Sequence, residues 1–262
     1  MSRIAETFAR LRREGRGGFI PFITAGDPDL RTTRELLIEL ARVGASIIEL
    51  GVPFSDPMAD GPVIQRASER ALRHGFGIDG ILETVAGARL EMDVPIVLFS
   101  YFNPLLQFGL ERLCREAQSA GVDAVLVTDL APEEGSEFSA GLSAHKLEMI
   151  FLVAPTSTDA RLRMVAERAG GFIYAVSRAG VTGARRDVSR DAERLVARVR
   201  KVSDLPVAVG FGISNAEQVA EVWSYADAVV VGSALVAEIE RTGGAPDVVQ
   251  RVGDFARRLL PV

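Results

Sequence analysis

The sequence predicts a (β/α)8 barrel, in which eight parallel strands close into a cylinder and helices cover its outside. Eight short apolar runs, rich in valine, isoleucine and phenylalanine, show no strict polar alternation, which is typical of parallel strands buried on both faces. Segments with helical periodicity separate these runs. The length of 262 residues suits a fold that commonly forms one domain of about 250 residues. We therefore expect a single barrel domain over residues 1–262.

The predicted strands occupy residues 19–24, 46–51, 95–101, 123–129, 149–154, 171–177, 205–211 and 226–232. Helical periods are clearest over residues 30–43, 110–120, 189–202 and 215–223. Gly44, Gly121 and Gly170 stand near helix ends, where a left-handed cap residue is favoured. Extra helices are expected at residues 2–14, in the long stretch between the second and third strands, and after the eighth strand.

A doubly wound parallel sheet is the alternative architecture, and it usually carries a G-x-G-x-x-G turn after its first strand. Here the first strand is followed by Thr24-Ala25-Gly26-Asp27-Pro28, which lacks that spacing. No linker or low-complexity segment divides the chain. The closed barrel is therefore favoured over the open sheet.

Composition narrows the class of protein. Hydrophobic residues make up 48% and charged residues 25%, as in an average globular protein, and the net charge of −5 argues against nucleic acid or anionic membrane as the main partner. Cys114 is the single cysteine, which excludes an internal disulfide. His74 and His145 fall in helical patterns away from strand ends, so no metal site is predicted. With no long apolar span and no signal core, we expect a soluble, cytoplasmic protein.

Two carboxylates give the strongest chemical signal. Glu49 ends an apolar strand, and Asp60 follows eleven residues later in a loop rich in glycine, proline and aspartate. A carboxyl group at the end of a buried strand loses solvation and holds its proton more tightly, so it can act as an acid or base near neutral pH. The spacing alone fits equally well a strand-end ion pair at Glu49 and a turn-forming Asp60.

Glycines after the last two strands predict a phosphate site. Gly210-Phe211-Gly212 follows the seventh strand, and Gly232-Ser233 follows the eighth and opens a helix. Barrels often bind phosphate there through backbone N–H groups and the positive end of a short helix. The alternative is two ordinary glycine turns.

The loop after the sixth strand, residues 177–185, is rich in small residues. Its two glycines, Gly180 and Gly183, predict a mobile lid, and we expect Gly183 to donate its backbone N–H to the same phosphate.

Residues 49–65 read E-L-G-V-P-F-S-D-P-M-A-D-G-P-V-I-Q, which closely resembles the signature of the tryptophan synthase alpha chain family. Further matches run in order across nearly the whole chain, at residues 21–28, 101–104, 129–130, 180–183, 210–213 and 232–234. One departure is Ala131, before Pro132, where the family usually has proline. The resemblance implies that this loop faces a partner chain.

The resemblance implies a lyase that cleaves indole-3-glycerol phosphate by a retro-aldol reaction to indole and glyceraldehyde 3-phosphate, with no metal and no cofactor. Glu49 matches the family's proton carrier, and Asp60 matches the carboxylate that faces the indole N–H. The matching wall of the apolar slot for the ring is Phe22, Phe99, Leu126, Leu152 and Phe211. Tyr101 and Tyr174 match its polar members, and Thr182 matches the lid residue that fastens Asp60. The matching phosphate donors are Gly183, Gly212, Gly232 and Ser233.

The resemblance also implies a partner, the tryptophan synthase beta chain, in an α2β2 complex. The beta chain holds pyridoxal phosphate and receives indole through an internal channel. The implied interface covers the loops after the second, third and fourth strands, at residues 53–60, 103–104 and 131–133. Two other functions remain open: another phosphate-binding barrel isomerase or lyase, and a non-catalytic activator of the beta chain.

Overall fold

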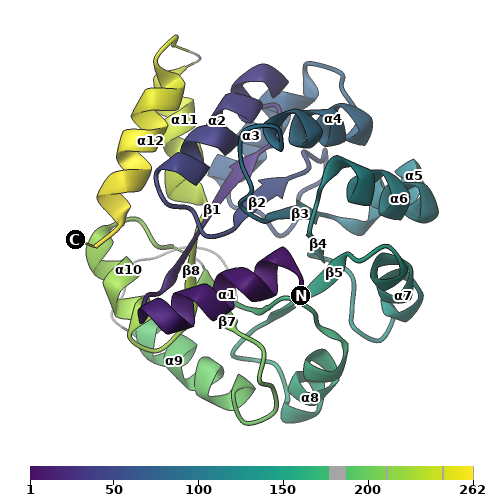
Figure 1. Cartoon of the computed structure of the whole chain (residues 1–262), viewed down its shortest axis with the longest axis vertical. Coiled ribbons are helices and arrows are strands. Elements are labelled where there is room, and N and C mark those ends of the chain that lie inside the picture. The colour runs from purple at the N-terminus through teal and green to yellow at the C-terminus, as the bar shows by residue number, and fades with distance from the viewer. Residues whose placement is uncertain (177–186, 211, 244, 262) are drawn as a thin grey trace.

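Eight parallel strands form a closed barrel in the computed structural model, which describes residues 1–176, 187–210, 212–243 and 245–261. Each strand pairs with the next, and β8 pairs with β1 to close the cylinder (Figure 1). The strands are β1 (Gly18–Thr24), β2 (Ile48–Gly51), β3 (Ile96–Ser100), β4 (Ala124–Val127), β5 (Glu148–Val153), β6 (Ile173–Val176), β7 (Val207–Gly210) and β8 (Ala228–Val231). The predicted fold class is confirmed, with strand ends that differ from the predicted ones by a few residues.

Helices surround the barrel (Figure 1). They are α1 (Arg3–Glu14), α2 (Leu30–Arg42), α3 (Pro62–Leu72), α4 (Ile78–Ala88), α5 (Phe102–Phe108), α6 (Leu110–Ala120), α7 (Ser136–Ala144), α8 (Asp159–Arg168), α9 (Asp187–Val199), α10 (Ala216–Trp223), α11 (Ser233–Thr242) and α12 (Val248–Leu259). The extra helices expected at the N-terminus, after the second strand and after the eighth are present as α1, α3 and α12. Helix α5 was not expected.

A hydrogen bond to a distant residue explains where α5 begins. Asp129, just beyond β4, accepts a hydrogen bond from the backbone N–H of Phe102 at 2.7 Å, which satisfies a free donor of the first helical turn. Pro104 falls within that turn, where a missing N–H costs nothing. The capping group is 27 residues away along the chain, so local periodicity did not reveal the helix.

Helix α1 closes the amino-terminal end of the barrel. Its side chains Ile4, Phe8 and Leu11 are buried in the cluster that fills the barrel interior, together with Ile47, the residue before β2. The opposite, carboxyl-terminal end stays available for a site, as in other barrels of this kind.

Strand alternation decides which way Glu49 points. Ile47 belongs to the interior cluster, whereas Ile48 and Leu50 belong to the cluster between the strands and the outer helices. Since successive side chains of a strand face opposite sides, Glu49 points into the barrel. Parallel pairing sets it beside Phe22 of β1 and Val97 of β3.

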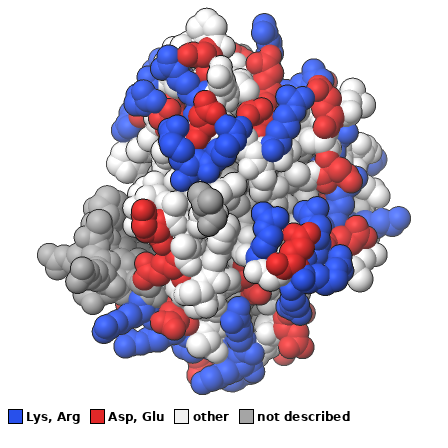
Figure 2. Space-filling view, turned by 60° about the vertical axis from the view of Figure 1, so that its left-hand side comes forward, with Lys and Arg blue, Asp and Glu red and all other residues white. Residues whose placement is uncertain are grey.

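Charge is spread over one face of the molecule. On the face shown in Figure 2, basic and acidic side chains are interspersed, and neither sign forms a continuous patch. No helix among the described ranges has the length and apolar character needed to cross a membrane. The same ranges contain no group of three or more histidine, cysteine or acidic residues placed to hold a metal ion.

Candidate active site

Glu49 is the second residue of the four-residue strand β2 and is almost completely buried, with 1% of its surface exposed. Its Oε1 atom has no hydrogen-bond partner among the described residues. Burial disfavours the charged form and raises the pKa of Glu49 from 4.5 to about 8. At neutral pH this side chain therefore carries a proton that it can give away.

Tyr174 of β6 faces Glu49 across the barrel. Burial, and then the charge of Glu49, raise the pKa of the Tyr174 hydroxyl well above its ordinary value. A side chain at Gly210, at the end of β7, would place its Cβ 2.1 Å from the Tyr174 hydroxyl oxygen. Glycine is therefore needed at the end of β7 to leave room for this tyrosine.

Asp60 lies half-buried in the loop between β2 and α3. Burial raises its pKa from 3.8 to about 6, and a hydrogen bond with Tyr101 opposes this shift. The backbone holds the loop in place: the Asp60 carbonyl accepts a hydrogen bond from Gln65 Nε2 at 2.9 Å, and the Ala59 N–H donates to the Tyr101 hydroxyl at 2.8 Å. At neutral pH Asp60 is mostly ionised, so the two carboxyl groups have different charge states.

A narrow pocket lies at the carboxyl ends of β1, β2 and β3; Asp60 lines it, whereas Glu49 and Tyr174 do not. Among the predicted site residues it is lined by Phe22, Phe99, Tyr101 and Asp60. The Phe22 and Phe99 rings meet edge to face with centroids 5.3 Å apart. Such walls suit a flat aromatic ligand.

The predicted slot residues Leu126, Leu152 and Tyr174 belong to the interior cluster beneath this pocket. Phe99 packs against that cluster and also against the small cluster around Phe22, so it connects the two groups. The structure therefore brings the described members of the predicted slot into one continuous region.

Phe22 also connects the carboxylates to the predicted phosphate loop. A Cβ at Gly51, two residues after Glu49, would lie 2.5 Å from the Phe22 ring, and a Cβ at Gly232 would lie 3.5 Å from the same side chain. Gly232 precedes Ser233, the first residue of α11, where backbone N–H groups lack intrahelical partners and attract anions. Gly212 has a φ of 73°, in the left-handed region that favours glycine.

Three predicted site residues, Thr182, Gly183 and Phe211, lie outside the described residues. The pocket is also lined by residues that the sequence analysis did not identify as substrate-binding: Thr24, Val52, Ile64, Ser68 and Ser100. The Thr24 hydroxyl is buried without a partner in the described part of the chain. The position of Thr24 at the end of the first strand could have identified it as a pocket residue. Ile64 and Ser68 could have been identified by their spacing of one helical turn on the helix that follows Asp60.

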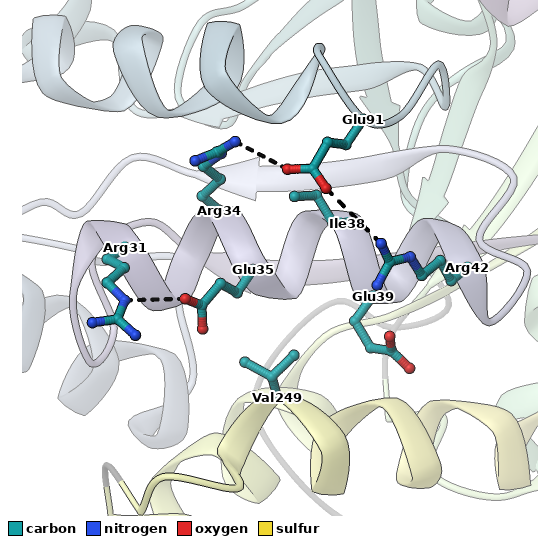
Figure 3. Close-up of a pocket in the computed structure, with 8 residues that line it drawn as sticks. All are labelled: Arg31, Arg34, Glu35, Ile38, Glu39, Arg42, Glu91 and Val249. Carbon is teal, nitrogen blue, oxygen red and sulfur yellow. Dashed lines mark hydrogen bonds and ion pairs between the residues drawn. The ribbon is translucent and has the colours of Figure 1, made fainter.

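A second hollow, of about 370 Å³, lies on the outer surface between α2, α12 and the turn after α4 (Figure 3). Its charged side chains pair with one another, Arg31 with Glu35 and Arg34 with Glu91, both at 3.0 Å. No strand end contributes to it, so it is separate from the site inside the barrel.

The fold and the site define a class of protein: a (β/α)8 barrel with two carboxyl groups of raised pKa, Glu49 inside the barrel and Asp60 in the loop after β2. Comparison with known proteins gives the particular family. A family model described as tryptophan synthase alpha chain matches residues 8–259. The tryptophan synthase alpha chain of Geobacter sulfurreducens is 54% identical over 259 residues, which cover 99% of this chain and 98% of that one.

Solved structures agree. Tryptophan synthase subunit alpha from Legionella pneumophila str. Paris has a TM-score of 0.91 and 37% identity, covering 99% of this chain and 97% of that one. A chain from the tryptophan synthase α2β2 complex of Pyrococcus furiosus has a TM-score of 0.87 and 38% identity, covering 93% and 97%. The chain belongs to the tryptophan synthase alpha chain family, the lyase subunits that cleave indole-3-glycerol phosphate in tryptophan biosynthesis.

Proposed function

We propose that Glu49 and Asp60 carry out the cleavage of indole-3-glycerol phosphate in this chain. The observation that carries the proposal is the separation of their pKa values, about 8 for Glu49 and about 6 for Asp60. Near pH 7 one carboxyl group is protonated and the other is ionised. When the surroundings of two carboxyl groups separate their pKa values in this way, the group with the higher pKa acts as the acid and the other stays anionic.

Glu49 first gives its proton to C3 of the indole ring, which leaves positive charge on the ring nitrogen. The Asp60 carboxylate accepts a hydrogen bond from the ring N–H and stabilises that charge. The Glu49 carboxylate then removes the proton from the glycerol hydroxyl next to the ring. The carbon–carbon bond breaks, its electrons return to the ring, and an aldehyde and neutral indole result, with Glu49 protonated again.

The remaining site residues position the substrate. Phe22 and Phe99, with Leu126 and Leu152 beneath them, form the slot for the ring, and the backbone at Gly212, Gly232 and Ser233 binds the phosphate. Tyr101 holds the Asp60 loop through the N–H of Ala59. Thr182 is proposed as the lid residue, Gly183 as a further phosphate donor and Phe211 as part of the slot; these three lie outside the described residues.

Indole release from indole-3-glycerol phosphate tests the catalytic pair. Glu49→Gln should lose about 10²–10⁴-fold in kcat because a positioned acid–base group contributes that much. Asp60→Asn should also be severe. Asp56→Asn is the matched control: Asp56 is exposed in the same loop and hydrogen-bonds the Ser55 hydroxyl. Normal turnover of Glu49→Gln, or equal losses in the two asparagine variants, would contradict these roles.

We also propose that the chain works with a tryptophan synthase beta chain in an α2β2 complex, and that pyridoxal phosphate belongs to the beta chain while this chain uses no cofactor. The Pyrococcus furiosus relative comes from such a complex. An exposed apolar side chain in the expected interface supports the proposal: Met58, in the loop of residues 53–60, is 93% exposed. Leu106 of α5, two residues beyond the expected range 103–104, is 49% exposed.

A binding titration with purified beta chain tests the partner and its surface. Met58→Ser should weaken binding because it removes an apolar contact next to Asp60. Leu90→Ser is the matched control, since Leu90 is 83% exposed in a turn before β3, at the other end of the barrel. The interface assignment fails if the two variants bind equally well, and the partner assignment fails if the unaltered chain does not bind.

A further inference from the structure

Four charged side chains connect three elements around the site. Arg70 of α3 binds Asp27 through two parallel hydrogen bonds, each 2.8 Å long, from Nε to Oδ1 and from Nη2 to Oδ2. Its third nitrogen, Nη1, donates to Glu240 Oε1 of α11 at 2.8 Å. Arg66, one turn earlier on α3, binds the same Glu240 through two bonds of 2.7 and 2.8 Å.

Burial distinguishes the two arginines. The Asp27 side chain is 1% exposed and that of Arg70 28%, whereas the Arg66 and Glu240 side chains are 48% and 31% exposed. A bidentate pair with a buried carboxylate holds a fixed geometry, while exposed pairs contribute little. Arg70 therefore holds the cluster in a fixed geometry, and Arg66 adds an exposed ion pair to it.

The ion pairs of Arg70 lie on the helix that directly follows the Asp60 loop. Helix α3 begins at Pro62, two residues after Asp60. Its inner face packs through Ala67, with Val63 and Ile64, against Phe22 and against Val236 of α11. Helix α11 begins at Ser233. A shift of α3 would therefore move Asp60 and one wall of the ring slot relative to the phosphate loop.

We propose that Arg70 is a positioning residue for the cleavage reaction: by holding Asp27 and Glu240 together, it fixes α3, and with it Asp60, against the turn after β1 and against α11. The inference rests on the proposed function, in which Asp60 stabilises the ring cation and Ser233 binds the phosphate. Arg70 acts through the helix and does not touch the reacting atoms. Misplacing a catalytic group by about 1 Å can cost as much as 10²-fold in rate, so a loosened α3 should lower kcat.

Arg70→Lys tests the proposal with the fold preserved, because lysine keeps a positive charge beside the buried Asp27 but cannot span both carboxylates. We expect kcat to fall about tenfold, with a smaller rise in KM, because the interaction that is lost matters most in the transition state. Arg66→Lys is the matched control on the same helix and the same partner, and its kcat should stay within about twofold of the unaltered chain, as for exposed pairs. Arg70→Met, which leaves Asp27 unpaired, should lose more activity than Arg70→Lys.

Fluorescence of Trp223, the single tryptophan, reports whether each variant is folded. A folded Arg70→Lys variant with the same kcat and KM as Arg66→Lys would overturn the positioning role and leave the catalytic assignment intact. Full activity of Asp60→Asn beside an active unaltered chain would overturn the role of Asp60, and the positioning role with it. Failure of the unaltered chain to release indole would overturn both.

Discussion

Replacing Glu49 by glutamine should stabilise the folded protein, and the gain should grow with pH. Burial raises the pKa of this carboxyl group from 4.5 to about 8, so the folded chain keeps a proton that the unfolded chain releases. Stability that depends on this proton is fully present below pH 4.5 and is lost as the pH rises through about 8. Glutamine has the same shape, never ionises, and so removes the pH-dependent cost of folding.

The magnitude follows from the two pKa values. Each pKa unit is worth about 1.36 kcal/mol. A pH of 7 is 2.5 units above the pKa of 4.5 that the Glu49 carboxyl has in the unfolded chain. This difference gives about 3 kcal/mol in favour of the glutamine variant. Above pH 8 the difference levels off at 3.5 units, from 4.5 to about 8, or about 5 kcal/mol. Near pH 5 it is about 1 kcal/mol.

Urea unfolding at pH 5, 7 and 9, followed by Trp223 fluorescence, measures this difference. The buried amide of glutamine needs partners of its own, and that cost is the same at every pH, so the slope with pH carries the information. Glu83→Gln, at an exposed position on α4, controls for the loss of one negative charge. A stability difference for Glu49→Gln that does not change between pH 5 and pH 9 would refute the reasoning.

The remaining predictions concern activity. The pH profile of kcat/KM should be bell-shaped, rising as Asp60 ionises near pH 6 and falling as Glu49 ionises near pH 8; a flat profile from pH 5 to 9 would contradict both assignments. Gly232→Ala should raise KM for indole-3-glycerol phosphate and affect binding of the phosphate-free analogue indolepropanol much less, because the added Cβ meets Phe22 only at an ordinary 3.5 Å. Equal losses for both ligands would mean that Gly232 serves the fold alone. Gly210→Ala should lower kcat, since its Cβ would lie 2.1 Å from the Tyr174 hydroxyl; unchanged turnover and melting temperature would show that Tyr174 relocates at no cost.

Much of the fold was predictable from the sequence because its signals are local. Buried parallel strands read as continuous apolar runs, so all eight strands were predicted from composition and spacing. Glu49 and Asp60 were identified because they stand in one short, distinctive segment. The strand that carries Glu49 is buried in any barrel, which made a raised pKa predictable in direction.

Other features depend on contacts between distant parts of the chain. Helix α5 is capped by Asp129, just beyond the next strand, and Thr24 joins the pocket only because β1 lies beside β2. Arg70 reads as one more surface arginine on an amphipathic helix, yet it binds Asp27 and Glu240, which lie 43 and 170 residues away in sequence.

The sequence by itself determined the strand and helix order, the family and the two acids, since each of these is written in neighbouring residues. Tertiary structure alone decided how far the pKa values of the two acids are raised, the contact of Phe22 with both Gly51 and Gly232, and the ion pairs through which Arg70 holds α3. The physical reason is that desolvation and packing depend on which surfaces meet when the barrel closes, and closure joins β1 to β8 across more than 200 residues.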